Sequence, residues 1–253
     1  MNEHIPGVLV TRPAHQSSSF IKQIEALGAT AISLPVIQIS PVEPALPDLD
    51  LGSYAIFIFI SANAVENGLK YLINSANFAE TLICAIGSRT AQTLHNSGIT
   101  DVILPQTGFN SESLLDLEIF KPGTITGKNV LIIRGQGGRE FLADTLRGRG
   151  ARVDYLEVYK REIPDVDIKP IRQLWSAGKI NIISVTSNES LKNLYYMCQD
   201  TTRDLLLNTT LITPSERCTE LARELGFCNQ IFQATSATDE AMIKQLKNWL
   251  DTN

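Results

Sequence analysis

Residues 8–36 read VLVTRPAHQSSSFIKQIEALGATAISLPV, and residues 130–158 read VLIIRGQGGREFLADTLRGRGARVDYLEV. The second stretch aligns with the first without a gap, at a constant offset of 130 − 8 = 122 residues. Each stretch contains a short β-branched run, then an amphipathic segment, then a second apolar run. That order predicts a strand–helix–strand unit. The chain therefore contains this unit twice.

Further matches follow in the same order along the chain. They pair SANAVEN at 61–67 with SNESLKN at 187–193, GSRTAQTLHNSG at 87–98 with SERCTELARELG at 215–226, and Asn110-Ser111-Glu112 with Thr238-Asp239-Glu240. General similarity among βα units is the alternative explanation, and it accounts for one such match more easily than for four. The ordered set favours an internal duplication.

Short apolar runs alternate with amphipathic stretches along most of the chain. The predicted strands are 8–12, 31–39, 55–60, 82–86, 102–104, 130–134, 153–159, 182–186, 211–213 and 231–234. The predicted helices are 16–27, 63–73, 89–96, 111–119, 138–149, 189–198, 217–225 and 238–250. Near-continuous apolar strands indicate parallel sheets covered on both faces. The predicted fold class is α/β, with two similar, flavodoxin-like, internally duplicated parallel-sheet domains.

Two segments predict how the domains are connected. Residues 35–47 are rich in proline, and residues 158–164 are their counterpart in the second repeat. Proline favours extended or strand-edge geometry, so both segments are predicted to be extended crossovers. We therefore assign 36–41 and 158–164 to the interdomain connection. One domain is then 42–160, and the other is discontinuous, comprising 1–38 and 165–253.

The composition excludes several classes of protein. The 253 residues are 43% hydrophobic and 19% charged, with a formal net charge of −5, which is typical of a globular chain. A negative net charge does not favour general attraction to nucleic acid or to an anionic membrane. No apolar run approaches the ~18 residues of a spanning helix, and no basic segment followed by an apolar one opens the chain. These observations predict a cytoplasmic protein.

Metal chemistry finds little support in the sequence. The four cysteines have no metal-ligand spacing and are predicted to be buried thiols; they are Cys84, Cys198, Cys218 and Cys228. The three histidines are scattered and have no neighbouring cluster of carboxylates or thiols. We predict no metal site.

Small polar residues and arginines follow many of the predicted strands. In parallel sheets, ligands bind beyond these carboxyl ends, where helix N-termini present free N–H groups. Ordinary helix capping explains any one such residue, but six polar strand ends with interspersed arginines favour a cleft that binds anions. The candidate ligand-binding residues are Arg12, Ser61, Asn63, Gly87, Thr90, Arg134, Arg139, Thr186 and Ser187.

The glycine-rich loop RGQGGR at 134–139 does not match a nucleotide-binding motif. Gly135, Gly137 and Gly138 do not complete G-x-G-x-x-G, because position 140 is Glu. The P-loop pattern is absent from the sequence. A tight strand-to-helix turn whose amides approach a carboxylate fits the loop better.

Tyr159 is the candidate catalytic residue. It ends a predicted strand on the second crossover, flanked by Lys160 and Arg161. Its phenol can act as a general acid at this position. The structural alternative is that the Tyr159 ring only packs the connection between the two domains. The sequence alone leaves both open.

These motifs together resemble the uroporphyrinogen-III synthase family over nearly the whole chain. The resemblance rests on LVTRPAHQ at 9–16, IGSRT at 86–90, NSESL at 110–114, RGQGGR at 134–139 and EVY at 157–159. It implies two similar α/β domains joined by a two-stranded ladder, the first being discontinuous. It also implies a cyclising hydro-lyase of porphyrin and heme biosynthesis that uses no cofactor.

The implied reaction closes hydroxymethylbilane, a linear tetrapyrrole, into uroporphyrinogen III in the interdomain cleft. Loss of the terminal hydroxyl gives an azafulvenium cation, which forms a spiro intermediate and closes with the last ring, ring D, inverted. By motif position, Ser61 and Thr90 are expected near the substrate, and Tyr159 assists departure of the hydroxyl. The expected partner is this small molecule alone, without nucleic acid or membrane, and the expected state is a monomer.

Two other functions stay open at this point. One is a non-catalytic two-domain protein that binds a small polyanion, and the other is an inactive, synthase-like regulatory domain. Formation of uroporphyrinogen III from hydroxymethylbilane distinguishes the synthase from both.

Overall fold

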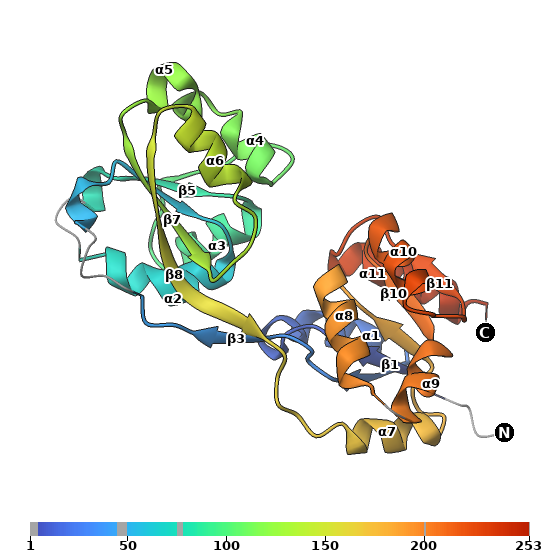
Figure 1. Ribbon diagram of the computed structural model, residues 1–253. Coiled ribbons are helices and arrows are strands. Elements are labelled where there is room, and N and C mark those ends of the chain that lie inside the picture. Colours follow the sequence, from blue (N-terminus) through green and yellow to red (C-terminus); the bar gives the residue numbers. More distant parts are fainter. Residues whose placement is uncertain (1–4, 45–49, 75–77, 200, 253) are drawn as a thin grey trace. The chain divides into compact units, whose positions relative to one another are not determined.

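The computed structural model describes residues 5–44, 50–74, 78–199 and 201–252 (Figure 1). The chain forms two compact units: unit 1 is Met1–Gln38 with Glu162–Asn253, and unit 2 is Ile39–Arg161. Residues 45–47 of the predicted proline-rich crossover lie outside the described part. Independent folding of 42–160 stays a prediction.

Unit 1 is built on a five-stranded sheet in the order β11-β10-β9-β1-β2, with parallel pairing throughout. Its strands are β1 (Gly7–Val10), β2 (Thr30–Ser33), β9 (Ile182–Ser184), β10 (Thr210–Thr213) and β11 (Ile231–Gln233). Its helices are α1 (Ser18–Ala26), α7 (Lys169–Ser176), α8 (Asn188–Met197), α9 (Thr201–Leu207), α10 (Glu216–Glu224) and α11 (Asp239–Leu250). Apolar residues of α1 and α11 pack against Val8 and Val10 on one sheet face.

Unit 2 is built on a six-stranded sheet in the order β3-β8-β7-β4-β5-β6. Its strands are β3 (Gln38–Pro41), β4 (Ile56–Phe59), β5 (Leu82–Ala85), β6 (Val102–Ile103), β7 (Asn129–Gly135) and β8 (Arg152–Glu162). Its helices are α2 (Ala62–Leu72), α3 (Ser88–Asn96), α4 (Ser111–Leu115), α5 (Pro122–Ile125) and α6 (Phe141–Gly148). Strands β8 to β6 pair in parallel.

The two sheets share one strand order. The aligned repeats pair β1 with β7, β2 with β8, β9 with β4, β10 with β5 and β11 with β6. Unit 1 then reads β2-β1-β9-β10-β11, and unit 2 reads β8-β7-β4-β5-β6. Chance similarity of single βα units does not require a common order, so the duplication predicted from sequence is supported by the fold. The α/β fold class is confirmed.

Strands β3 and β8 are neighbours in the sheet, and each contains a point where the chain passes between units. The backbone N–H of Val42 donates to the carbonyl oxygen of Val158 at 3.0 Å, which extends this pairing beyond β3. The two-stranded ladder implied by the family resemblance is thus present.

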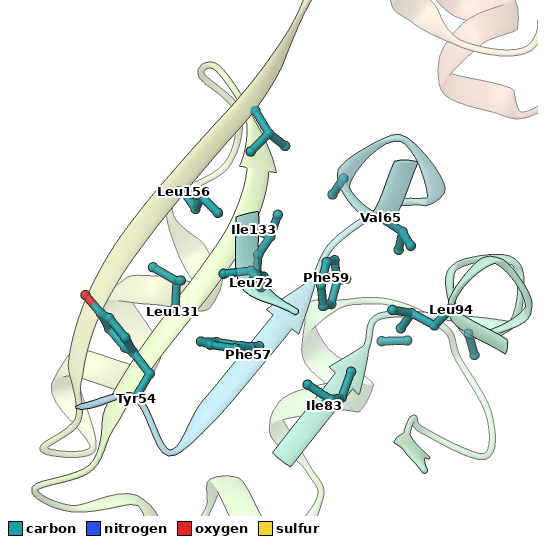
Figure 2. Close-up of a cluster of buried hydrophobic side chains, with 14 of the residues drawn as sticks. Tyr54, Phe57, Phe59, Val65, Leu72, Ile83, Leu94, Leu131, Ile133 and Leu156 are labelled. Atoms are coloured by element: carbon teal, nitrogen blue, oxygen red, sulfur yellow. The ribbon is translucent and has the colours of Figure 1, made fainter. Parts of the chain in front are cut away.

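Alternation along β4 fills two apolar layers in unit 2. Phe57 and Phe59 face the layer shared with α2 and α3, which Figure 2 shows. Ile56 and Ile58 face the opposite layer, shared with α4, α5 and α6. All four side chains are fully buried. A strand covered on both faces reads as a continuous apolar run, which is why its position was predictable.

Several predicted boundaries are wrong. The single strand predicted at 31–39 is divided into β2 and β3, because the chain leaves one sheet between them: β2 pairs with β1 in unit 1, and β3 pairs with β8 in unit 2. The helix predicted from 138 begins at Phe141, since Gly137 and Gly138 have positive φ angles of 70° and 108°. The helix predicted at 111–119 ends at Leu115, and extended Leu117 separates it from a 3-10 turn.

The prediction of four buried thiols is wrong at one position. Cys84, Cys198 and Cys218 are buried, and burial raises their pKa values to about 12, 12 and 11. Cys228 is exposed, because it lies in the turn between α10 and β11.

Within the described residues, none of the helices has the length and apolar character needed to cross a membrane.

Candidate active site

The carboxyl ends of three neighbouring strands meet at one edge of the unit 2 sheet. Phe59 in β4 is in register with Ala85 in β5 and with Ile133 in β7. Ser61, Gly87 and Arg134 follow these three positions along their strands. The structure therefore brings these three residues to one edge of unit 2, as expected for a parallel sheet.

Tyr159 reaches this edge because of an irregularity in β8. Arg134 pairs with Glu157, whereas the next residue of β7, Gly135, pairs with Tyr159. One residue of β8 is thus passed over, and such a bulge redirects the side chains beyond it. The Tyr159 side chain is buried, with 1% of the residue exposed, and its hydroxyl lies 3.0 Å from Ser61 Oγ.

Ser61 is the N-cap of α2. Its Oγ accepts a hydrogen bond from the backbone N–H of Ala64 at 3.1 Å. An N-cap hydroxyl lies at the positive end of the helix dipole. The hydroxyl pair of Ser61 and Tyr159 is therefore linked directly to the start of a helix.

A hollow of about 190 Å³ opens beside Tyr159 within unit 2. Its lining combines an apolar surface with a polar rim. The apolar side chains are Ile60, Ile86, Ile132, Leu142 and Ala143. The polar residues include Ser111, Arg134, Arg139, Tyr155, Tyr159 and Arg161. Such a surface suits an organic ring that carries anionic groups.

Arg134 lines this hollow, but its guanidinium group is already hydrogen-bonded within the protein. Its Nη1 donates to Glu140 Oε1 at 2.9 Å, its Nε donates to the carbonyl of Gly135 at 3.1 Å, and its Nη2 donates to the carbonyl of Gly137. Its Cζ lies 4.5 Å from the centre of the Tyr155 ring. With 3% of the residue exposed, Arg134 braces the glycine-rich loop. Its direct contact with a ligand stays a prediction.

Glu140 closes this network. It accepts hydrogen bonds from Tyr155 Oη and from Arg134, and these bonds lower the pKa of its carboxyl. Burial and the hydrogen bond to Glu140 raise the pKa of Tyr155. The network therefore favours an ionised carboxylate beside a protonated phenol.

Arg139 differs sharply from Arg134. Its side chain is 78% exposed, and its Nη2 forms an ion pair with Glu112 Oε1 at 3.3 Å. A surface pair of this kind is weak, so the guanidinium is able to exchange partners. Arg139 is thus the accessible cation of the loop.

The other predicted residues of unit 2 lie in the first turns of two helices. Asn63 and Thr90 are both buried, in α2 and α3. Gly87 is the N-cap of α3, and a Cβ at this position would lie 3.1 Å from Cβ of Phe109. Because the Asn63 and Thr90 side chains are buried and Gly87 has none, these positions offer mainly backbone N–H groups at the carboxyl edge of the unit 2 sheet.

Three predicted residues belong to unit 1. Ser187 caps α8, where its Oγ accepts from the N–H of Ser190 at 3.0 Å, and Thr186 precedes it. Arg12 is buried, donates to Asp239 Oδ1, and lies with its Cζ 4.3 Å from the centre of the Phe20 ring. The predicted location of the substrate between the two units stays a prediction.

Sequence reasoning missed several residues of the hollow. Tyr155 and Arg161 lie on the same strand as Tyr159, four residues before it and two after it, and this even spacing was a usable signal. Gly135 was treated only as part of a loop motif. Within the residues that the structure describes, no group of three or more potential metal-binding side chains comes together.

The fold and this edge define a class of protein: a duplicated α/β chain in which one of two similar units carries a tyrosine–serine pair beside a cation-rimmed hollow. A family model described as "Uroporphyrinogen-III synthase HemD" matches residues 18–244. The chain belongs to the uroporphyrinogen-III synthase family.

Individual relatives agree with this assignment. The chain is 34% identical to a uroporphyrinogen-III synthase of Escherichia coli strain K12 over 248 residues, covering 95% of this chain and 100% of the relative. It is 32% identical to the Salmonella typhimurium protein of the same name, with the same coverage. The structure of the Helicobacter pylori uroporphyrinogen-III synthetase matches with a TM-score of 0.65 at 18% identity, covering 98% of this chain and all of that one. That likeness concerns the fold.

Proposed function

We propose that this chain is a uroporphyrinogen-III synthase, which cyclises hydroxymethylbilane to uroporphyrinogen III with loss of water and inversion of ring D. The observation that carries this function is the match over the full length of the Escherichia coli enzyme at 34% identity. The family assignment distinguishes a synthase from a general polyanion-binding protein, and the tyrosine–serine pair of unit 2 supplies a group for the chemistry.

The first step breaks the C–O bond of the terminal hydroxymethyl group. The electron pair stays with oxygen, which takes a proton and leaves as water, while the pyrrole nitrogen stabilises the cation that remains. Tyr159 is the proposed proton donor, since its hydroxyl lies beside the hollow and is held by Ser61. Its contribution falls within the ~10²–10⁴ range of positioned general acids.

The later steps depend on geometry more than on acid–base groups. The substituted α-carbon of the last ring attacks the cationic methylene carbon, which gives a spiro intermediate. The bond from that α-carbon to its original methylene bridge then breaks, and the bridge bonds to the free α-carbon of the same ring, which leaves the ring inverted. Loss of one proton from carbon then restores aromaticity, and it returns the proton that Tyr159 gave. Holding the chain in the reactive conformation is worth several orders of magnitude in rate. The apolar lining of the hollow is suited to seat one pyrrole ring.

The carboxylates of the substrate need cationic or N–H partners. Arg139 is the exposed candidate at the rim, and the first turns of α2 and α3 offer backbone amides. The remaining predicted ligands, Arg12, Thr186 and Ser187, are proposed contacts within unit 1.

The test is direct. Purified protein is incubated with hydroxymethylbilane, and the porphyrin isomers are separated after oxidation. Uroporphyrinogen III is expected, whereas accumulation of the uncatalysed isomer alone would contradict the proposal and favour a binding or regulatory protein. Cell fractionation and light scattering respectively test the proposed cytoplasmic location and monomeric state.

A further inference from the structure

We propose that Ser61 is a positioning residue that orients and polarises the Tyr159 hydroxyl, and that Gly135 provides the space through which the Tyr159 ring reaches it. This inference rests on the proposed function. It gives Ser61 a role through Tyr159 in place of the direct substrate contact predicted from the sequence.

The hydrogen bonds form a continuous chain. The backbone N–H of Ala64 donates to Ser61 Oγ at 3.1 Å, and Ser61 Oγ lies 3.0 Å from Tyr159 Oη. Ser61 has a single hydroxyl proton, so a bond donated to Tyr159 directs the phenol proton away from Ser61. Tyr159 is buried and Ser61 is half-buried, so polarisation along these bonds strengthens each one. The oxygen of Tyr159 is then stabilised as its proton departs.

Gly135 makes this geometry possible. A Cβ at Gly135 would lie 2.6 Å from both Cε2 and Cζ of Tyr159, far inside van der Waals contact. The backbone of Gly135 does not have a positive φ, so conformational freedom does not explain the glycine. The close approach of the tyrosine ring does.

The other repeat shows that the fold does not need this arrangement. At the same offset of 122 residues, Gly135 aligns with Pro13 and Tyr159 aligns with Ile37. The capping serine is retained as Ser187, but its hydroxyl lies 2.9 Å from Ser190 Oγ instead of a tyrosine. One repeat therefore folds with proline and isoleucine where the other has glycine and tyrosine. The combination of Ser61, Gly135 and Tyr159 is a feature of unit 2 rather than a requirement of the architecture.

The sharpest experiment separates capping from positioning. Ser61→Gly removes the hydroxyl, while glycine remains a good N-cap that costs only a few tenths of a kcal/mol relative to serine. We expect kcat to fall about tenfold with KM changed less than twofold. Ser61→Thr keeps a hydroxyl and is expected to restore at least half of the wild-type kcat. The same change at the equivalent cap, Ser187→Gly, calibrates the loss of thermal stability.

A double-mutant cycle tests whether Ser61 acts through Tyr159. In a Tyr159→Phe background, Ser61→Gly is expected to lower kcat by no more than twofold, because the group it positions is already absent. An equal tenfold fall in both backgrounds would overturn the proposal, since it would give Ser61 an independent role. Failure of Ser61→Thr to restore turnover would overturn it too.

Gly135→Ala tests the spacer. It is expected to lower kcat at least tenfold, and to do so less than twofold in the Tyr159→Phe background. The control is Gly148→Ala in α6, where a Cβ has no heavy atom within 4 Å and turnover should be unchanged. Unaltered kcat in Gly135→Ala would refute the spacer role. These outcomes presuppose an active wild-type enzyme, so failure of the proposed function itself is recognised separately, by the absence of uroporphyrinogen III from wild-type assays.

Discussion

Arg134→Met removes a buried guanidinium that the sequence and the structure describe differently. The sequence predicts an anion ligand at this position, but the structure gives the guanidinium three protein acceptors and a stacked tyrosine. Arg139, five residues later in the same loop, has a side chain that is 78% exposed. The two arginines are therefore expected to respond in opposite ways.

The cost of Arg134→Met follows from these contacts. Breaking a buried ion pair by removing one partner costs about 3–5 kcal/mol. The two carboxylates beside Arg134, those of Glu140 and Glu157, are 50% and 39% exposed and regain water when the arginine is lost. Methionine also replaces much of the apolar stem. We therefore expect a loss of about 2–4 kcal/mol in the free energy of unfolding of unit 2.

The assay is thermal unfolding followed by circular dichroism, together with steady-state kinetics. For a unit of about 120 residues, a loss of 2–4 kcal/mol lowers Tm by roughly 6–15 °C. Arg139→Met removes a surface ion pair worth about 0–1 kcal/mol, so its Tm should change by less than about 3 °C. Its KM should rise roughly two- to tenfold, and this rise should diminish at high salt because exposed charges are screened.

One pattern of results would refute the reasoning. If Arg134→Met keeps the wild-type Tm and raises KM as much as Arg139→Met does, Arg134 is a ligand and not a brace. Arg134→Lys provides a further check. It retains the charge but lacks the planar fork, so it should recover only part of the lost stability.

Three further predictions concern stability and folding. The hydrogen bond from Tyr155 is the first cause of the lowered pKa of Glu140. Stabilisation by this carboxylate is therefore present above its unfolded pKa and is lost as pH falls through its folded pKa. Glu140→Gln should flatten the fall in Tm below about pH 4.5. Thiol reagents should label Cys228 rapidly in the native protein and the three buried cysteines only on unfolding, and labelling of more than one thiol in native protein would contradict the described burial. Fragment 42–160 should unfold cooperatively in urea, and fragment 1–125 should not. The reason is that 1–125 lacks strands β9, β7 and β8, which flank its own strands in the two sheets. Cooperative unfolding of fragment 1–125 would indicate consecutive domains instead.

The sheet was predictable because its information is local. Buried parallel strands are near-continuous apolar runs, and the matched stretches of the two repeats carry the same strand–helix order. The element boundaries that were predicted wrongly depend on local features that the hydrophobic pattern does not record. The chain passes from one sheet to the other between β2 and β3, and the positive φ angles of Gly137 and Gly138 delay a helix. Helices α7 and α9 were missed because they have only 8 and 7 residues, about two turns each, which is too short for a repeating pattern to be recognised even though α7 is amphipathic.

The site was predictable only in its location. Polar residues at the ends of parallel strands gather at one edge by geometry, and Ser61, Gly87 and Arg134 did so. The pairing of Ser61 with Tyr159 spans 98 residues and depends on a bulge, which leaves no mark in the hydrophobic pattern. The occupation of Arg134 by its own loop was equally hidden, because charge and position do not distinguish a brace from a ligand.

The duplication helps to make that distinction. Arg12 and Arg134 occupy the same place in the two repeats, and both are buried. Each donates to a carboxylate at the start of a helix, Asp239 in one unit and Glu140 in the other. Each also lies over an aromatic ring, at 4.3 and 4.5 Å. The carboxylates and rings come from positions that do not align, so what the two units share is a buried arginine whose charge is paired within its own unit, whereas the tyrosine and glycine found in one unit need a reason specific to that unit. The shared arginines therefore point to architecture, and the unshared Tyr159 points to chemistry.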